Sequence, residues 1–143
     1  MVREKFLLIN NKAFTLLEML LVLIVLSTLT FLLTIGLRSM SINSTINKEI
    51  YQFQSVLDIA KSCSIVNRTD ATISIATNSY TFSCNDMSKT YDTDNISISS
   101  NVNKDIVFNK EGIINMGRTI KFYKDEYNKE LVITIGRSSS YVK

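Results

Sequence analysis

The sequence predicts an α+β fold, in which one long amino-terminal helix packs on a carboxy-terminal antiparallel β-sheet. Three patterns predict it. Residues 19–37 carry no charge and are mostly Leu, Val and Ile. Residues 42–60 place apolar side chains at three- and four-residue steps, and the sequence after Asn67 alternates apolar and polar residues in short runs. A membrane-length helix, an amphipathic helix and a sheet account for these patterns in turn.

The 143 residues divide into four predicted segments: a basic leader (1–13), a transmembrane helix (14–37), its amphipathic continuation (38–66) and a β-rich globular head (67–143). As a helix, residues 19–37 extend about 28 Å, close to the thickness of a bilayer core. Three cationic residues precede this stretch, and only Arg38 follows it closely. The positive-inside rule therefore predicts a single-pass cell-membrane protein with a cytoplasmic amino terminus and an external head.

A secretory signal peptide or an uncleaved signal anchor is the alternative interpretation. A signal peptide has a shorter apolar core, followed by a small-residue cleavage site. Here Ala13 comes before the apolar run, and Gly36-Leu37-Arg38 ends it without such a site. A signal anchor would tolerate Glu18 if its carboxylate reached the membrane interface beside Lys12.

Glu18 is the most unusual residue of the chain, because a carboxylate near the start of a membrane-length helix is costly and marks a candidate functional site. The run Lys12-Ala13-Phe14-Thr15-Leu16-Leu17-Glu18-Met19 resembles the processing signature of type IV prepilins. Most prepilins have Gly where this chain has Ala13. Competence prepilins of Gram-positive bacteria often read K-A-F-T-L-x-E, which matches this sequence.

The prepilin resemblance implies a role for each residue of the signature. A prepilin peptidase would cut between Ala13 and Phe14 on the cytoplasmic side and methylate the new Phe14 amine. In filaments of this family, Glu18 would pair with the Phe14 amine of a neighbouring subunit. An unpaired charge in a low dielectric is costly, so this pairing would set the register of assembly and assist extraction from the membrane.

The amphipathic stripe continues the apolar segment as one helix. It consists of Ile42, Ile46, Ile50, Phe53, Leu57 and Ala60. The chain contains no proline, so we expect one helix to run through Gly36 and to end near Val66. Gly36 either weakens the helix as a hinge or marks the exit from the membrane.

Six short runs are predicted strands, separated by Gly, Asn and Asp. They are residues 72–76, 80–84, 96–100, 105–108, 118–123 and 130–135, with residues 77–79 as a hairpin turn. One apolar face of the sheet is expected to pack on the helix stripe. Its predicted core residues are Ile75, Phe82, Ile106, Phe108, Ile120, Phe122, Ile133 and Ile135.

For the two cysteines, Cys63 and Cys84, we predict a disulfide, and one alternative stays open. Outside the membrane they can form a disulfide, and closing a loop of about 20 residues contributes about 3 kcal/mol in the chain-entropy model. The alternative is two free buried thiols that act as small apolar side chains.

The absence of histidine excludes several kinds of chemistry. It rules out Ser-His-Asp triads, Cys-His dyads and HExxH zinc helices, and two cysteines alone cannot close a zinc site. The sequence also has no Gly-rich phosphate-binding motif. We therefore expect a protein that is not an enzyme and needs no cofactor or metal.

Residues 106–112, 119–123 and 131–137 resemble the heads of minor pseudopilins of the GspH and FimT type. The resemblance implies a structural subunit of a surface filament that takes up DNA during natural competence. Its partners would be major and minor pseudopilins, the prepilin peptidase and the assembly platform protein. It would be a membrane protein before assembly and lie at the cell surface after processing.

Two alternative functions stay open at this point. The first is a minor pilin of a type IV pilus for adhesion or motility. The second is a pilus module that binds DNA directly, with Lys121, Lys124 and Arg137 as candidate contacts. Basic residues interleaved with acids usually form a solvated face, and Asp125 and Glu126 interrupt this group. The part of the chain beyond Leu37 is nearly neutral, so it predicts no strong electrostatic attraction to nucleic acid.

Overall fold

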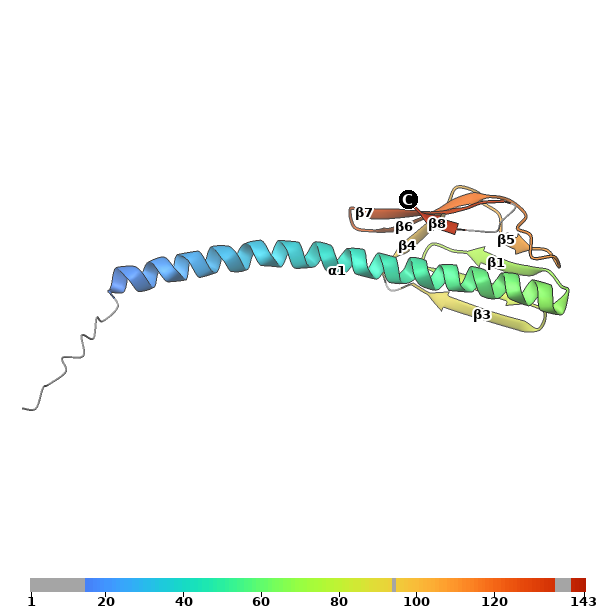
Figure 1. Cartoon of the computed structure of the whole chain (residues 1–143), viewed down its shortest axis with the longest axis horizontal. Coiled ribbons are helices and arrows are strands. Elements are labelled where there is room, and N and C mark those ends of the chain that lie inside the picture. Colours follow the sequence, from blue (N-terminus) through green and yellow to red (C-terminus); the bar gives the residue numbers. More distant parts are fainter. Residues whose placement is uncertain (1–14, 94, 136–139) are drawn as a thin grey trace, which may run out of the picture. The chain divides into compact units, whose positions relative to one another are not determined.

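The computed structural model describes residues 15–93, 95–135 and 140–143. Over these residues one helix, α1 (Leu16–Asn67), is followed by eight strands (Figure 1). The chain divides into two compact units, residues 1–38 and residues 39–143, and α1 contributes to both. The predicted α+β class is confirmed. The predicted leader, residues 1–13, and Phe14 lie outside the described residues.

The head contains two antiparallel sheets of four strands each. Sheet A has the order β3-β2-β1-β5, and sheet B has the order β4-β6-β7-β8. The bounds are β1 (Ala71–Ile75), β2 (Ser79–Cys84), β3 (Met87–Asp92), β4 (Ser97–Ser100), β5 (Ile106–Phe108), β6 (Arg118–Lys124), β7 (Tyr127–Ile133) and β8 (Ser140–Val142). The prediction of a single sheet is therefore corrected to two sheets.

The chain first passes from sheet A to sheet B at the connection between β3 and β4. The backbone N–H and hydroxyl of Thr93 both donate to the carbonyl oxygen of Asn78, at 3.0 and 2.9 Å. The N–H of Ile98 donates to the carbonyl oxygen of Thr77 at 2.6 Å. These bonds anchor the connection at the β1–β2 turn, and β4 then pairs with β6 in the second sheet.

Two strands were not predicted from the sequence. In β3, only Tyr91 is partly buried and the other residues are exposed, so the strand has no apolar alternation to reveal it. The strand β8 has three residues, two of them exposed, and β7 is its one partner strand among the described residues. Both form because a neighbouring strand offers a hydrogen-bonding edge, which depends on the tertiary fold.

The predicted core is mostly confirmed. Six of its residues are buried: Phe82, Ile106, Phe108, Ile120, Phe122 and Ile133. Ile75 is partly buried and packs against the core cluster. Ile135 was predicted wrongly: it is 64% exposed, because β7 ends at Ile133 and so does not carry Ile135 on its inward face.

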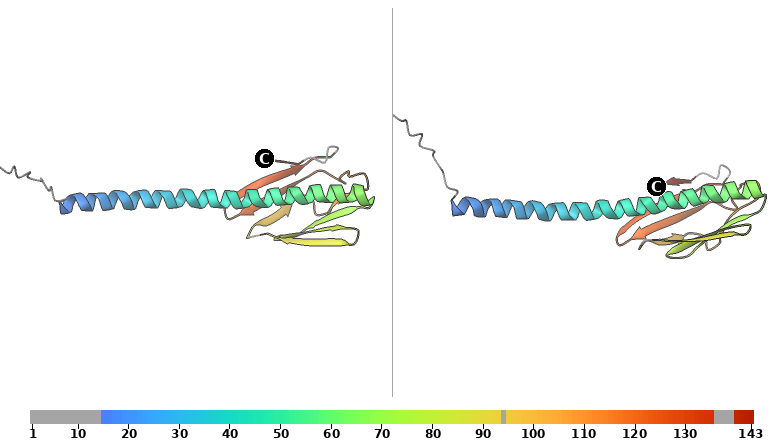
Figure 2. Two further views of the ribbon diagram at one scale, coloured as in Figure 1. Left: turned by 60° about the horizontal axis from the view of Figure 1, so that its bottom comes forward. Right: turned by 90° about the horizontal axis from the view of Figure 1, so that it is seen from below.

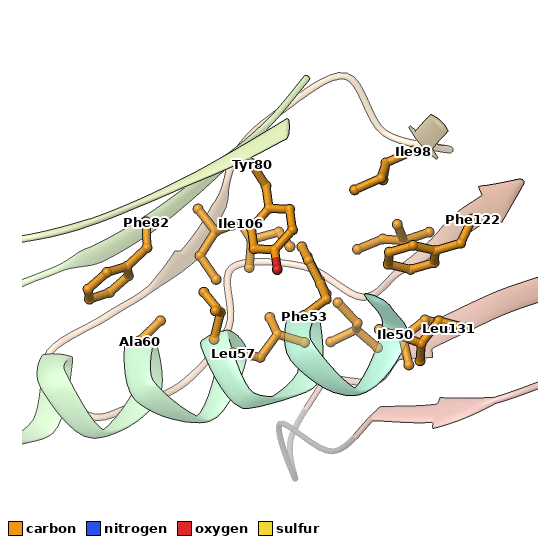
Figure 3. Close-up of a cluster of buried hydrophobic side chains, with 14 of the residues drawn as sticks. Ile50, Phe53, Leu57, Ala60, Tyr80, Phe82, Ile98, Ile106, Phe122 and Leu131 are labelled. Atoms are coloured by element: carbon orange, nitrogen blue, oxygen red, sulfur yellow. The ribbon is translucent and has the colours of Figure 1, made fainter. Parts of the chain in front are cut away.

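The apolar stripe of α1 is buried at all six predicted positions, and the helix ends at Asn67, one residue beyond the prediction. Figure 2 shows the carboxy-terminal part of α1 alongside both sheets. Phe53 occupies the centre of this contact (Figure 3). Its ring makes edge-to-face contacts with Tyr80 of β2, at 4.9 Å between centroids, and with Phe122 of β6, at 5.7 Å. One helix residue thus packs against both sheets.

A disulfide joins Cys63, near the end of α1, to Cys84, at the end of β2. Both cysteines are buried. The predicted pairing is confirmed, and the alternative of two free thiols is excluded. The bond ties the end of the helix to the end of β2, and the β1–β2 hairpin of sheet A lies within the loop that it closes.

Candidate functional site: the start of α1 and its apolar segment

The start of α1 is capped by Thr15. The N–H of Glu18 donates to the Thr15 hydroxyl oxygen at 3.3 Å and to the Thr15 carbonyl oxygen at 3.0 Å. The N–H of Met19 also donates to that carbonyl, at 3.2 Å. Thr15 is therefore the N-cap residue and Glu18 stands three positions later, which is the spacing of a capping box.

Glu18 lies in the first turn of the helix. Unpaired backbone N–H groups and the helix dipole give this end a partial positive charge, which favours a carboxylate locally. The structure thus places the acid where a helix tolerates it best, at the boundary of the apolar segment. The predicted cleavage residues Ala13 and Phe14 lie outside the described residues, so the cleavage, the methylation and the pairing of Glu18 with the Phe14 amine of a neighbouring subunit stay predictions.

The apolar segment of α1 is exposed on all sides. An 18-residue window of the helix has a mean hydropathy of 2.6, and none of it is buried inside the protein. Large side chains such as Leu23 (65% exposed) and Phe31 (67%) have no protein cover. Within the described residues, α1 is the one helix long and apolar enough to cross a membrane. It is a candidate membrane span.

The hydroxyl groups of this segment are satisfied within the helix. Each donates to a backbone carbonyl three or four residues earlier, at 2.7–2.9 Å: Ser27 to Ile24, Thr28 to Val25, Thr30 to Leu26 and Thr34 to Phe31. An unsatisfied polar group in hydrocarbon is costly, so this arrangement removes the main obstacle to placing four hydroxyls in lipid.

Gly36 lies within α1, and a Cβ atom at this position would meet no atom within 4 Å. Packing inside the chain therefore does not require glycine here. The two interpretations of Gly36, a hinge or the exit from the membrane, both remain.

The structure describes two of the three predicted DNA-contact residues, Lys121 and Lys124. Lys121 and Lys124 belong to β6 at positions of opposite parity, so they start on opposite faces of the sheet. The ammonium group of Lys121 forms an ion pair with Glu130 at 2.9 Å. That pairing lowers the pKa of Glu130, first through the hydrogen bond from Lys121 and then through its charge. Arg137 lies outside the described residues.

Sequence reasoning missed the buried residue Arg118. Its guanidinium donates to the carbonyl oxygens of Lys104 and Asp105, the latter at 2.9 Å, and thereby holds the loop before β5. Burial lowers the pKa of Arg118. The signal was present, because Arg118 has the same parity along β6 as the buried residues Ile120 and Phe122.

A second missed group is the Tyr80 hydroxyl, which points toward α1 in the core (Figure 3). Burial raises the pKa of Tyr80, and the nearby carboxylate of Glu49 raises it further by a smaller amount. Tyr80 therefore stays neutral and acts as a packing residue. Across residues 15–93, 95–135 and 140–143, no cluster of three His, Cys, Asp or Glu side chains could hold a metal ion.

Comparison of the chain with models of protein families, with curated proteins and with solved structures gave no match.

Proposed function

We propose that this chain is a minor pseudopilin of the ComGD type, a structural subunit of a filament that takes up DNA during natural competence. The observation that carries the proposal is the start of α1: a Thr15 cap, Glu18 in the first turn, and then an exposed apolar segment with satisfied hydroxyls. An α+β head with a disulfide follows the helix, in keeping with a domain outside the cytoplasm.

In this proposal the apolar segment has two successive environments. Before processing it lies in the membrane, and the peptide bond between Ala13 and Phe14 is presented to the prepilin peptidase on the cytoplasmic side. After cleavage, the new amine of Phe14 is a cation close to the start of the helix. The carboxylate of Glu18 pairs with the amine of a neighbouring subunit, because both charges would otherwise stay unpaired in an apolar bundle.

The pairing also gives the assembly its register. A subunit that entered with a different axial offset would leave one carboxylate and one amine unpaired, which costs several kcal/mol. Because the remainder of the segment is uniformly apolar, its packing alone discriminates poorly between offsets. One charged pair per subunit therefore determines the stagger.

The proposal is tested by expressing variants of the full chain in the bacterium that encodes it. Glu18→Ala should leave the removal of residues 1–13 intact, as seen by the mass of the chain, and should strongly reduce its amount in sheared surface filaments. Glu111→Ala removes an exposed carboxylate of the head and serves as the matched control. Normal incorporation of Glu18→Ala would refute the assembly role.

The assignment to DNA uptake needs a separate measurement. Deletion of the gene should abolish or strongly reduce transformation, and the wild-type chain should restore it. Unchanged transformation together with defective surface attachment or motility would instead support the minor pilin of a type IV pilus.

A further inference from the structure

The two cysteines of the buried disulfide differ in access from solvent. Cys63 is 8% exposed, whereas Cys84 is 1% exposed. Cys63 also lines an apolar groove of about 450 Å³ beside the carboxy-terminal part of α1, and Cys84 does not line it. The other lining residues are Ser55, Asp58, Ile59, Ser62, Val66, Asn67 and Met87. A small molecule in this groove therefore reaches Cys63 before Cys84.

The sulfur atom of Cys63 lies next to a residue of the groove. The side-chain amide of Asn67 donates to the Cys63 Sγ at 3.1 Å and to the Cys63 carbonyl oxygen at 3.2 Å. Asn67 is itself exposed and lines the groove. The groove thus extends to the neighbourhood of the disulfide.

Access decides which sulfur of a disulfide reacts. Exchange begins when an external thiolate attacks one sulfur, and the other sulfur leaves as a thiolate. Attack at Cys63 forms a mixed disulfide between Cys63 and the external thiol, and it releases the thiolate of Cys84. One S–S bond breaks as another forms, so the step needs no further oxidant or reductant. Attack at Cys84 would require the charged thiolate to enter the core, which is costly.

The surroundings of Cys84 favour it as the leaving group. The Asn67 amide and the Thr69 hydroxyl are each 4.0 Å from the Cys84 Sγ. A donor directed at a thiolate stabilises the charge that develops on the leaving sulfur. The strand β2, which carries Cys84, is paired with β1 on one side and β3 on the other. The released thiolate is therefore held beside Cys63, where it can attack the mixed disulfide and restore the native bond.

The lining of the groove favours one class of thiol. Its apolar residues Ile59, Val66 and Met87 are exposed, and they provide contacts for the carbon atoms of a small thiol. Asp58 is the charged residue among those that line the groove, and it is exposed. Its carboxylate attracts a cationic thiol and repels an anionic one.

We propose that Cys63 is a thiolation site of the folded head. A small neutral or cationic thiol enters the groove, forms a mixed disulfide with Cys63 and releases Cys84, while the head stays folded. The same groove admits the reverse reaction, which returns the thiol to solvent. This chemistry depends on the disulfide and the groove and is independent of the role of Glu18 in assembly.

The test measures which cysteine carries the thiol. The detergent-solubilised full chain is incubated briefly with cysteamine, acidified to stop exchange, separated from the small thiol and alkylated. Trypsin then places the two cysteines in different peptides, because Arg68 lies between them. Mass spectrometry should find cysteamine on Cys63 and the alkyl group on Cys84, in about fivefold or greater excess over the reverse pattern. In guanidinium chloride, where both sulfurs are accessible, the ratio should approach one.

Three variants check the route and the class of thiol. Val66→Trp enlarges an exposed side chain of the groove and should slow formation of the Cys63 adduct about threefold. Tyr51→Trp, at an exposed position of α1 that does not line the groove, is the matched control and should leave the rate unchanged. Asp58→Asn should reduce the preference for cysteamine over the anionic mercaptoacetate about threefold at low ionic strength.

Equal labelling of the two cysteines in the native head, or an excess of label on Cys84, would overturn the proposal. Labelling that appears only at denaturant concentrations that unfold the head would overturn it as well, as would an unchanged rate in Val66→Trp. An unchanged preference in Asp58→Asn would overturn the selection of thiols by charge.

Discussion

Replacement of Phe53 by alanine is expected to destabilise the head strongly, because this ring joins α1 to both sheets. Phe53 is completely buried and makes edge-to-face contacts with Tyr80 and Phe122 (Figure 3). Truncation of a buried Phe to Ala costs about 3–5 kcal/mol, including the cavity left behind. Each aromatic pair contributes about 0.5–1.5 kcal/mol beyond its buried area, so we expect a loss of about 4 kcal/mol.

The loss is measured on the full chain in a mild detergent, by following the circular dichroism of the head during heating. For a domain of this size, about 4 kcal/mol corresponds to a fall in Tm of roughly 15–30 °C. Tyr51→Ala is the matched control, since Tyr51 belongs to the same helix and is 66% exposed. If Phe53→Ala lowered Tm by less than about 5 °C, the helix could not be coupled to both sheets through this ring.

Three further predictions concern the head. Reduction of the Cys63–Cys84 disulfide should lower the free energy of unfolding by about 3 kcal/mol, and the native chain should gain no alkyl groups when it is alkylated without reductant. Because Lys121 lowers the pKa of Glu130, this pair stabilises the fold above the ordinary glutamate pKa of about 4.5, and the contribution is lost as the pH falls through the lowered pKa of the folded state; Lys121→Met should therefore flatten the decline of Tm below about pH 4.5. Gly112→Ala should cost more than about 1 kcal/mol in a thermal melt, since φ is +74° and the added Cβ would lie 2.7 Å from a helix side chain; an unchanged Tm would contradict the strain.

The helix was predictable because its signals are local. The apolar run, the absence of proline and the three- and four-residue spacing each depend on neighbouring residues only, and they located the end of the helix to within one residue. The hairpin of β1 and β2 was equally predictable from alternation on both sides of a polar turn. Cys63 and Cys84 paired as proposed because the stripe and this hairpin placed both on inward faces.

Other features depended on contacts that no local pattern encodes. The exposed strand β3 exists because β2 offers it an edge, and its residues show no apolar alternation. Ile135 continues the alternation of β7 in the sequence, but the strand ends two residues earlier. The parity of Arg118 in β6 matches that of the buried residues, but its burial as a cation depends on the carbonyl oxygens of Lys104 and Asp105, which accept from its guanidinium.

The sequence by itself determined that this protein has a membrane-length helix with one acid near its start and an α+β head. These properties follow from the composition of the sequence and from the spacing of its apolar residues, neither of which depends on tertiary contacts. The tertiary structure alone decided that the head has two sheets, that Lys121 is paired with Glu130, and that Cys63 lines an apolar groove whereas Cys84 does not. The physical reason is that strand order and side-chain pairing depend on which distant segments meet, whereas periodicity specifies only which face of each segment is buried.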